Sequence, residues 1–192
     1  WKTEPGQIWQ AGRHRIMCGD CANSDDMSCL MRGNKADLLL SDPPYGVSYV
    51  GKTKESLVIE NDDLDEMELA ESVHRWFSSG VDSCRAGAYF VVTVPSRPLQ
   101  AIFVNDLKSR GILRQILVWV KDSLVLGHSE YHYRHEPILF GWLPGGNRLK
   151  NKDRTRTSVW EFDRPKASPE HPTMKPVPMF AYAISNHTKV EG

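Results

Sequence analysis

Short apolar segments that alternate with helical patterns predict an α/β fold with a mostly parallel sheet. Four apolar runs have the length and composition of strands buried on both faces: 15–18, 36–41, 88–94 and 115–120. Between these runs, apolar residues recur at helical spacing over 64–77 and again over 99–107. Strands and helices that alternate in this way are typical of parallel sheets with helical connections.

The helical patterns carry start and stop signals. Asp63 is a candidate N-cap for the first helix, because a carboxylate can accept hydrogen bonds from the free N–H groups of a first turn. The second pattern closes before Gly111, and a third helix is expected over 177–186, opened by prolines. Residues 143–170 are basic and rich in Gly and Pro with little periodicity, which predicts a long loop.

The composition is that of one ordinary globular domain. The chain has 192 residues, of which 40% are hydrophobic and 25% charged, and this excludes a disordered or collagen-like protein. No apolar run approaches the ~20 residues that span a bilayer. The sequence begins at Trp1 rather than Met and has no basic and apolar leader. We therefore expect a soluble intracellular domain.

The four cysteines favour free thiols over a disulfide scaffold or a metal site. Cys18 and Cys21 form a C-x-x-C pair, with His14 upstream and Cys29 downstream, and these four residues are the alternative zinc-binding set. Structural zinc usually requires a second pair at matching spacing, and none follows in the sequence. We therefore expect no metal.

The net charge of zero conceals a strong asymmetry along the chain. Residues 37–83 carry eleven acidic and three basic residues, whereas residues 84–192 carry sixteen basic and nine acidic residues. The densest basic cluster lies within 148–156, interrupted only by Asp153. Such a cluster can neutralise phosphates of a nucleic acid, although a solvated loop is an equally simple interpretation.

The tetrapeptide Asp42-Pro43-Pro44-Tyr45 follows the predicted strand 36–41, and parallel sheets bind ligands at the carboxyl ends of their strands. The two prolines fix φ and remove two backbone donors, so carbonyl groups are held outward beside the carboxylate. The motif therefore offers two acceptors and one aromatic plane, with no donor between them. This matches an exocyclic amine on a flat ring, which presents two N–H donors; a simple strand-ending turn is the structural alternative.

Residues 41–46 (SDPPYG) resemble the catalytic motif of amino-group DNA methyltransferases, which use S-adenosylmethionine to methylate adenine N6 or cytosine N4. The resemblance continues in chain order. Residues 14–21 (HRIMCGDC) resemble the strand whose acidic end holds the cofactor's adenine, and 119–121 and 133–140 resemble later sheet strands. Residues 171–176 (HPTMKP) resemble the family's H-P-T-x-K-P signature. This order is that of the β group, found in bacteria and their phages.

The resemblance implies a Rossmann-like methyltransferase sheet, a single catalytic domain over residues 1–192 and a cytoplasmic protein. Asp42, Pro43, Pro44 and Tyr45 are then catalytic. The Asp42 carboxylate and the Pro43 carbonyl accept the two N–H groups of a flipped-out base on which Tyr45 stacks, and the amine attacks the methyl group directly. The residues assigned to S-adenosylmethionine are Asp20, Cys21, Asp42, His171, Thr173 and Lys175. Family association favours adenine N6 over cytosine N4.

Double-stranded DNA is the partner that the resemblance implies, and a homodimer is compatible with it. The basic loop 143–166 is the expected target-recognition insert. The candidates for phosphate or guanine contacts are Arg148, Lys150, Arg154 and Arg156. Residues 128–135 are rich in aromatic residues and are a candidate surface for the flipped base. Their three histidines alternate as surface residues do, which argues against a metal site.

The sequence departs from the family pattern at its C-terminal end. In the β group, the helix after H-P-T-x-K-P leads into a strand that ends in a D-P-F-x-G-S-G-like loop, which holds the methionine part of the cofactor. Here the sequence ends at Gly192, where that strand is expected to begin. We therefore expect the C-terminal cofactor strands to be missing. A nucleic-acid-binding fragment without transferase activity is the alternative hypothesis.

Overall fold

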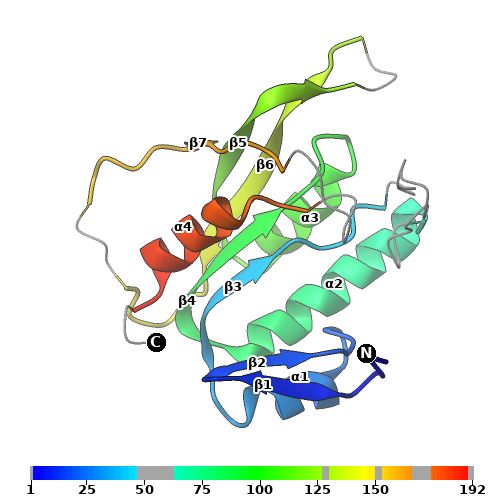
Figure 1. Ribbon diagram of the computed structural model, residues 1–192, viewed down its shortest axis with the longest axis vertical. Coiled ribbons are helices and arrows are strands. Elements are labelled where there is room, and N and C mark those ends of the chain that lie inside the picture. Colours follow the sequence, from blue (N-terminus) through cyan, green and yellow to red (C-terminus); the bar gives the residue numbers. More distant parts are fainter. Residues whose placement is uncertain (1, 47–62, 127–129, 150–152, 166–173, 190–192) are drawn as a thin grey trace.

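The computed structural model describes residues 2–46, 63–126, 130–149, 153–165 and 174–189 (Figure 1). The main sheet has the strand order β3-β4-β6-β5-β7. Its strands are β3 (Ala36–Ser41), β4 (Cys84–Thr93), β5 (Leu113–Val125), β6 (Tyr133–Trp142) and β7 (Val159–Glu161). The helices of the described residues are α1 (Ser24–Met31), α2 (Glu66–Ser83), α3 (Gln100–Ser109) and α4 (Val177–His187).

The strand directions confirm the predicted mostly parallel α/β sheet. Strand β3 is parallel to β4, and β5 is parallel to β7. Strand β6 lies between β4 and β5 and is antiparallel to both. Four strands of this sheet therefore share one direction and β6 is reversed, so the start of β6 lies at the carboxyl end of its neighbours.

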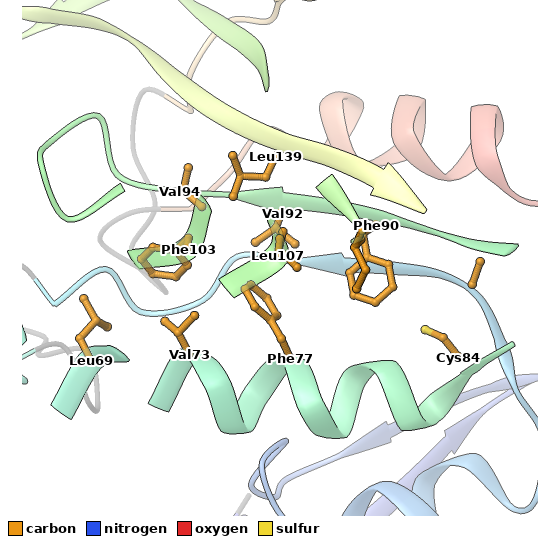
Figure 2. Close-up of a cluster of buried hydrophobic side chains, with 12 residues drawn as sticks. Leu69, Val73, Phe77, Cys84, Phe90, Val92, Val94, Phe103, Leu107 and Leu139 are labelled. Carbon is orange, nitrogen blue, oxygen red and sulfur yellow. The ribbon is translucent and has the colours of Figure 1, made fainter. Parts of the chain in front are cut away.

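Helices cover both faces of the sheet, as Figure 1 shows, and β4 supplies the centre of both cores. Successive side chains of a strand point to opposite faces. Accordingly, Phe90 and Val92 pack with Phe77 of α2 and Phe103 of α3 (Figure 2). Val91, between them, packs on the other face with residues of α4. All these β4 side chains are 0–1% exposed, so β4 is the strand buried on both faces.

The other main-sheet strands are less buried than the sequence predicts. Strand β3 lies at the edge of the sheet and all six of its residues are half-buried, although its apolar run predicts full burial. In β5, Leu117 and Trp119 are buried while Ile116 is 46% exposed. Apolar composition alone does not distinguish a central strand from an edge strand, because their difference lies in which neighbours pair with them.

The first predicted helix begins two residues later than expected. Asp65, not Asp63, is the N-cap of α2: its Oδ1 atom accepts hydrogen bonds from the N–H groups of Met67 and Glu68, at 2.8 and 2.9 Å. The Glu68 carboxylate accepts the Asp65 N–H at 3.0 Å and completes a capping box. The other two predicted helices are confirmed, as α3 and α4.

The predicted strand 15–18 is not part of the main sheet. It corresponds to β2 (His14–Met17), which pairs only with β1 (Ile8–Ala11) in a separate antiparallel hairpin within the described residues. Its side chains alternate between exposed and half-buried, with Ile16 59% exposed. The expectation of a strand buried on both faces is therefore wrong here. Arg15 donates a hydrogen bond to the Leu30 carbonyl at 2.7 Å and joins the hairpin to α1.

Besides β1, two elements of the structure were not expected from the sequence. Strand β7 interrupts the predicted loop 143–170, because the edge of β5 pairs with Val159–Glu161 and buries Trp160 to 6% exposure. Helix α1 has only a short apolar stripe of half-buried residues, Met27, Leu30 and Met31, and no fully buried residue. Asn23 caps it by accepting hydrogen bonds from the N–H groups of Asp25 and Asp26. No described helix is long and apolar enough to cross a membrane.

The cysteines are free thiols in the structure. Across the described ranges, no group of three or more His, Cys, Asp or Glu side chains converges as a metal site would require. The alternative zinc set of His14, Cys18, Cys21 and Cys29 is therefore not assembled.

Candidate active site

The predicted catalytic tetrapeptide lies at the carboxyl end of β3, beside the end of β4. Ser41 pairs with Val92, so Asp42 lies next to Thr93. The Thr93 hydroxyl lies 2.6 Å from Asp42 Oδ1, a distance typical of a strong hydrogen bond to a carboxylate. Thr93 is 1% exposed, whereas the Asp42 side chain retains 26% exposure. The parallel pairing of two strands thus anchors Asp42 while leaving part of it open to solvent.

A second carboxylate, Glu136, reaches the same place from β6. Because β6 is reversed, its first residues lie where β4 and β5 end, and Glu136 pairs with Trp119 of β5. Its Oε1 atom lies 2.7 Å from Lys121 Nζ. The Lys121 and Glu136 side chains are 9% and 17% exposed. Because the pair is buried, removal of either residue would leave the other as a buried charge whose desolvation penalty is no longer offset.

Lys175, just before α4, connects the two carboxylates. Its Nζ atom lies 2.9 Å from Asp42 Oδ1 and 3.4 Å from Glu136 Oε2, and its side chain is 7% exposed. Helix α4 packs against the sheet through Met179 and Ala183. This packing holds the residue that precedes the helix at the carboxyl end of the sheet.

The Tyr45 hydroxyl also lies between the two carboxylates, 3.2 Å from Asp42 Oδ1 and 3.3 Å from Glu136 Oε2. Burial and the negative charges of Asp42 and Glu136 raise the pKa of Tyr45 well above its ordinary value. The phenol therefore keeps its proton and acts as a donor to one carboxylate at a time. One face of its ring lies under Lys175, whose Nζ is 4.9 Å from the ring centroid.

Asp42, Lys121, Glu136 and Lys175 form a cluster of two carboxylates and two ammonium groups, here called the ion quartet, in which Asp42 alone keeps substantial exposure to solvent. Burial acts to raise the pKa of Glu136, but the adjacent Lys175 and Lys121 ammonium groups outweigh it, so that the pKa lies below its ordinary value. Glu136 is therefore charged at neutral pH and available as an acceptor.

The three donors to Asp42 all contact the same oxygen. Thr93, Tyr45 and Lys175 approach Oδ1, and no donor of the described chain reaches Oδ2. The adjacent Pro43 carbonyl likewise accepts no hydrogen bond from the described residues. Pro43 and Pro44 have no N–H group that could occupy the space beside these oxygens. Among the described residues, the end of β3 thus presents two unoccupied acceptors on a rigid support.

The distal parts of β5 and β6 extend past the rest of the sheet (top of Figure 1). Lys121 and Glu136 stand at the base of this extension. Of the aromatic candidates within 128–135, Tyr133 pairs with Val125, and Tyr131 is 87% exposed. His128 lies outside the described residues. The described part of 128–135 is thus a surface segment at the same end of the sheet as Asp42, the carboxyl end of the parallel strands.

Asp20 and Cys21, predicted to hold a cofactor, lie in the turn between β2 and α1, and both are exposed. The Asp20 Oδ1 atom accepts the Ala22 N–H at 2.8 Å, and the Asp20 N–H donates to Asp26 Oδ2 at 2.9 Å. Gly19 leaves room for this turn, because a Cβ there would lie 2.7 Å from Asp26 Oδ2. No hydrogen bond or ion pair within the described chain joins this turn to the ion quartet.

Arg148, one of the predicted basic residues, lies at the opposite end of the sheet. Arg148 stacks on Trp142 with its guanidinium 3.9 Å from the ring centroid. The neighbouring Asn147 carbonyl accepts a hydrogen bond from Arg85 at 2.9 Å. Arg85 is near the start of β4, and Thr93 ends it, so roughly 25 Å of strand separates them. The structure therefore does not bring Arg148 to Asp42.

The remaining predicted residues are placed as follows. Arg154 is exposed, and Arg156 is half-buried, with its Nε atom buried and unpartnered among the described residues. Lys150, His171 and Thr173 lie outside the described residues. Sequence reasoning missed Thr93, Lys121 and Glu136 as members of the site. A signal was present for two of them, because charged residues are seldom buried in apolar strands unless they are paired.

The fold is shared with solved structures of other proteins. M1.HpyAVI, in its complex with SAM, matches 86% of this chain and 72% of its own, with a TM-score of 0.57 and 19% identity. TTHA0409 from Thermus thermophilus, to which a DNA modification methylase function is ascribed, matches 84% of this chain and 72% of its own, with a TM-score of 0.56 and 15% identity. At this identity the likeness establishes the fold. No protein-family model matches the chain, and no curated protein matches its sequence.

Proposed function

We propose that this chain is the catalytic domain of an S-adenosylmethionine-dependent DNA methyltransferase that modifies the exocyclic N6 of adenine. The observation that carries the proposal is the end of β3, where Asp42 Oδ2 and the Pro43 carbonyl stand beside Tyr45 with no donor from the described residues. The fold likeness to M1.HpyAVI, crystallised with SAM, and to TTHA0409 supports the same class of reaction.

The two acceptors suit an amine that must become nucleophilic. An exocyclic amino group delocalises its lone pair into the ring. Hydrogen bonds from its two N–H groups to Asp42 Oδ2 and to the Pro43 carbonyl favour tetrahedral nitrogen and localise the lone pair. The nitrogen would then bond to the methyl carbon as the carbon–sulfur bond of the sulfonium breaks, and its surplus proton would pass to solvent by way of the partly exposed Asp42 carboxylate. Holding the amine in this orientation can lower the activation barrier by several kcal/mol, on the order of the lowering seen in favourable intramolecular reactions.

The amine must leave the duplex to reach these acceptors. Flipping costs a few kcal/mol, and stacking of the base on Tyr45 returns roughly 1–3 kcal/mol. Lys175 lies over one face of the Tyr45 ring, with Nζ 4.9 Å from the ring centroid. Adenine N6 is proposed over cytosine N4 on the resemblance to the β group, because both amines present the same two donors.

Part of the proposed cofactor site fits the residues present. With Asp20 Oδ1 occupied by the Ala22 N–H, Oδ2 is left for a hydroxyl or amino group of the adenosine end, next to Cys21. Lys175 has the charge for the methionine carboxylate, but it already contacts Asp42 and Glu136. His171, Thr173 and Lys175 are proposed for that end of the cofactor. When bound, S-adenosylmethionine supplies the methyl group as an electrophile.

Arg148, Lys150, Arg154 and Arg156 are proposed to contact DNA phosphates. Because Arg148 lies roughly 25 Å along β4 from the end that bears Asp42, the residues bind a part of the duplex distant from the flipped base. Replacing the exposed Arg154 with Ala is expected to weaken DNA binding and to reduce the slope of log affinity against log salt by about one. Arg13→Ala is the control, because Arg13 is an exposed arginine in the turn between β1 and β2, outside the predicted recognition insert.

Methylation of DNA tests the proposal directly. The protein is incubated with S-adenosylmethionine and mixed-sequence duplex DNA, and the digested nucleosides are examined for N6-methyladenine and N4-methylcytosine. We expect N6-methyladenine from the wild type and from Asp163→Asn, an exposed control, and none from folded Asp42→Asn. N4-methylcytosine would correct the base. If neither appears while the protein still binds DNA, the chain is a binding fragment and the enzymatic proposal fails.

A further inference from the structure

Glu136 belongs to no motif that the proposed reaction uses, yet both of its oxygens are engaged at the site. Oε1 contacts Lys121 at 2.7 Å, and Oε2 contacts Lys175 at 3.4 Å and the Tyr45 hydroxyl at 3.3 Å. A buried carboxylate that only filled space would be costly, because its desolvation must be compensated. The location of Glu136 therefore requires an explanation.

Two of the three donors to Asp42 are also held by Glu136. Lys175 and Tyr45 each contact Asp42 Oδ1 on one side and Glu136 Oε2 on the other. Each donor is thereby fixed between two acceptors, and neither is free to turn toward Asp42 Oδ2. Thr93, the third donor, is fixed by its place in β4, and its hydroxyl lies 2.6 Å from Oδ1.

Lys121 supplies the charge that makes this arrangement possible. Without it, the buried cluster would contain two carboxylates for one ammonium group. Lys121 contacts Glu136 on the oxygen that faces away from Lys175, so Oε2 remains available to Lys175 and Tyr45.

We propose that Glu136 is a positioning residue, which holds Lys175 and Tyr45 on Asp42 Oδ1 and thereby keeps Asp42 Oδ2 available to accept the substrate amine. This inference rests on the proposed methyl transfer. Loss of the Glu136 charge leaves Lys175 and Tyr45 with Asp42 as their charged acceptor. Either donor can then move onto Oδ2 and compete with the substrate.

The test compares Glu136→Gln, Glu136→Asp and the control Glu161→Gln, an exposed glutamate on β7 of the same sheet. Single-turnover methyl transfer to duplex DNA is measured together with the dissociation constants for DNA and S-adenosylmethionine. We expect Glu136→Gln to slow transfer about 10- to 100-fold at saturating DNA and S-adenosylmethionine, as a displaced reacting group does, so that any change in affinity through Lys175 or Tyr45 does not enter the rate. Glu136→Asp, which keeps the charge, loses less, and Glu161→Gln loses nothing.

A spectroscopic measurement separates positioning from general damage to the fold. Tyrosine ionisation is followed by ultraviolet absorbance, and Tyr45 is identified by the titration that Tyr45→Phe removes. Removal of a neighbouring negative charge should let Tyr45 ionise at lower pH in Glu136→Gln than in wild type. Glu161→Gln should leave this titration unchanged.

The outcomes distinguish the two proposals. If the wild type methylates DNA and Glu136→Gln does so at the wild-type rate, the role of Glu136 is refuted while the proposed function stands. A slower Glu136→Gln with an unchanged Tyr45 titration also refutes the positioning role. If the wild type transfers no methyl group to either base, the proposed function fails and the role of Glu136 falls with it.

Discussion

The ammonium group of Lys175 lies 2.9 Å from Oδ1 of Asp42, although the two residues come from opposite ends of the chain. The contact joins the loop after β3 to the residue before α4, across the carboxyl end of the sheet. It brings the Lys175 ammonium group against the same Asp42 oxygen that Thr93 and Tyr45 also contact. Within the described residues, Asp42 is therefore a carboxylate with one occupied and one unoccupied oxygen.

Lys175→Met is expected to destabilise the protein because it leaves Asp42 and Glu136 as facing negative charges. Removing one member of a buried ion pair costs about 3–5 kcal/mol, and the partial exposure of Asp42 places the expected loss near the lower end. Urea unfolding at pH 7 measures it, with the exposed Lys189→Met as control. A stability equal to wild type would show that the two carboxylates do not depend on Lys175.

Thr93→Val tests the shortest hydrogen bond to Asp42. Valine has nearly the shape of threonine but cannot donate to Oδ1, so a buried carboxylate oxygen loses one partner. We expect the free energy of unfolding to fall by about 1.5–3 kcal/mol, the range for hydrogen bonds to charged groups. Thr93→Ser, which retains the hydroxyl, should recover part of this loss. Identical unfolding curves for Thr93→Val and Thr93→Ser would contradict the role of the hydroxyl.

His187 makes the stability of the protein depend on pH. It is 8% exposed and lies against Tyr89 and Phe140, with ring centroids 4.5 and 5.1 Å away. Burial, together with the positive charge of Arg156, lowers the pKa of His187 from 6.5 to about 4. Between these values the unfolded chain binds a proton that the folded chain does not. Stability therefore falls as the pH decreases from about 6.5 to 4 and then no longer changes through this group.

Replacement of His187 by Phe should remove that pH dependence. The shift corresponds to on the order of 3 kcal/mol between pH 7 and pH 4, and phenylalanine can keep the ring contacts without a titrating group. Urea unfolding at several pH values compares the variant with wild type and with His74→Phe, an exposed histidine. An equally steep loss of stability in His187→Phe would assign the effect to other groups.

Gly141→Ala should disrupt the pairing of β5 and β6 that brings Glu136 and Lys121 together. A Cβ at Gly141 would lie 2.0 Å from the Ile112 carbonyl oxygen, which is backbone and cannot rotate away. We expect a loss of about 3 kcal/mol, the upper part of the range for overpacking. At Gly80 in α2 the added atom would meet the end of the Leu39 side chain, which can move. Gly80→Ala should therefore lose less stability. Thermal unfolding of both variants and of the wild type measures the two losses.

The chemistry of the tetrapeptide can be read from the sequence because it depends on local geometry. Proline fixes φ and lacks an N–H group wherever it stands, so the outward carbonyl and carboxylate at 42–45 need no tertiary information. The α/β class and the helices α2, α3 and α4 follow from periodicity for the same reason. One boundary differs from the prediction: Asp65 rather than Asp63 caps α2, because several carboxylates precede this helix and only the three-dimensional path of the chain decides which of them reaches the N–H groups of the first turn.

The tertiary structure alone decided how the tetrapeptide is supported. Thr93, Lys121 and Glu136 lie on three strands, and their meeting depends on strand register and on the reversal of β6. Periodicity shows that a segment is a strand but not which neighbour it pairs with. It therefore could not place β2 in a separate hairpin, β3 at an edge, or Arg148 at the far end of the sheet. The acceptor groups of the site were determined by the sequence, and which oxygen of Asp42 the donors occupy was decided by long-range contacts.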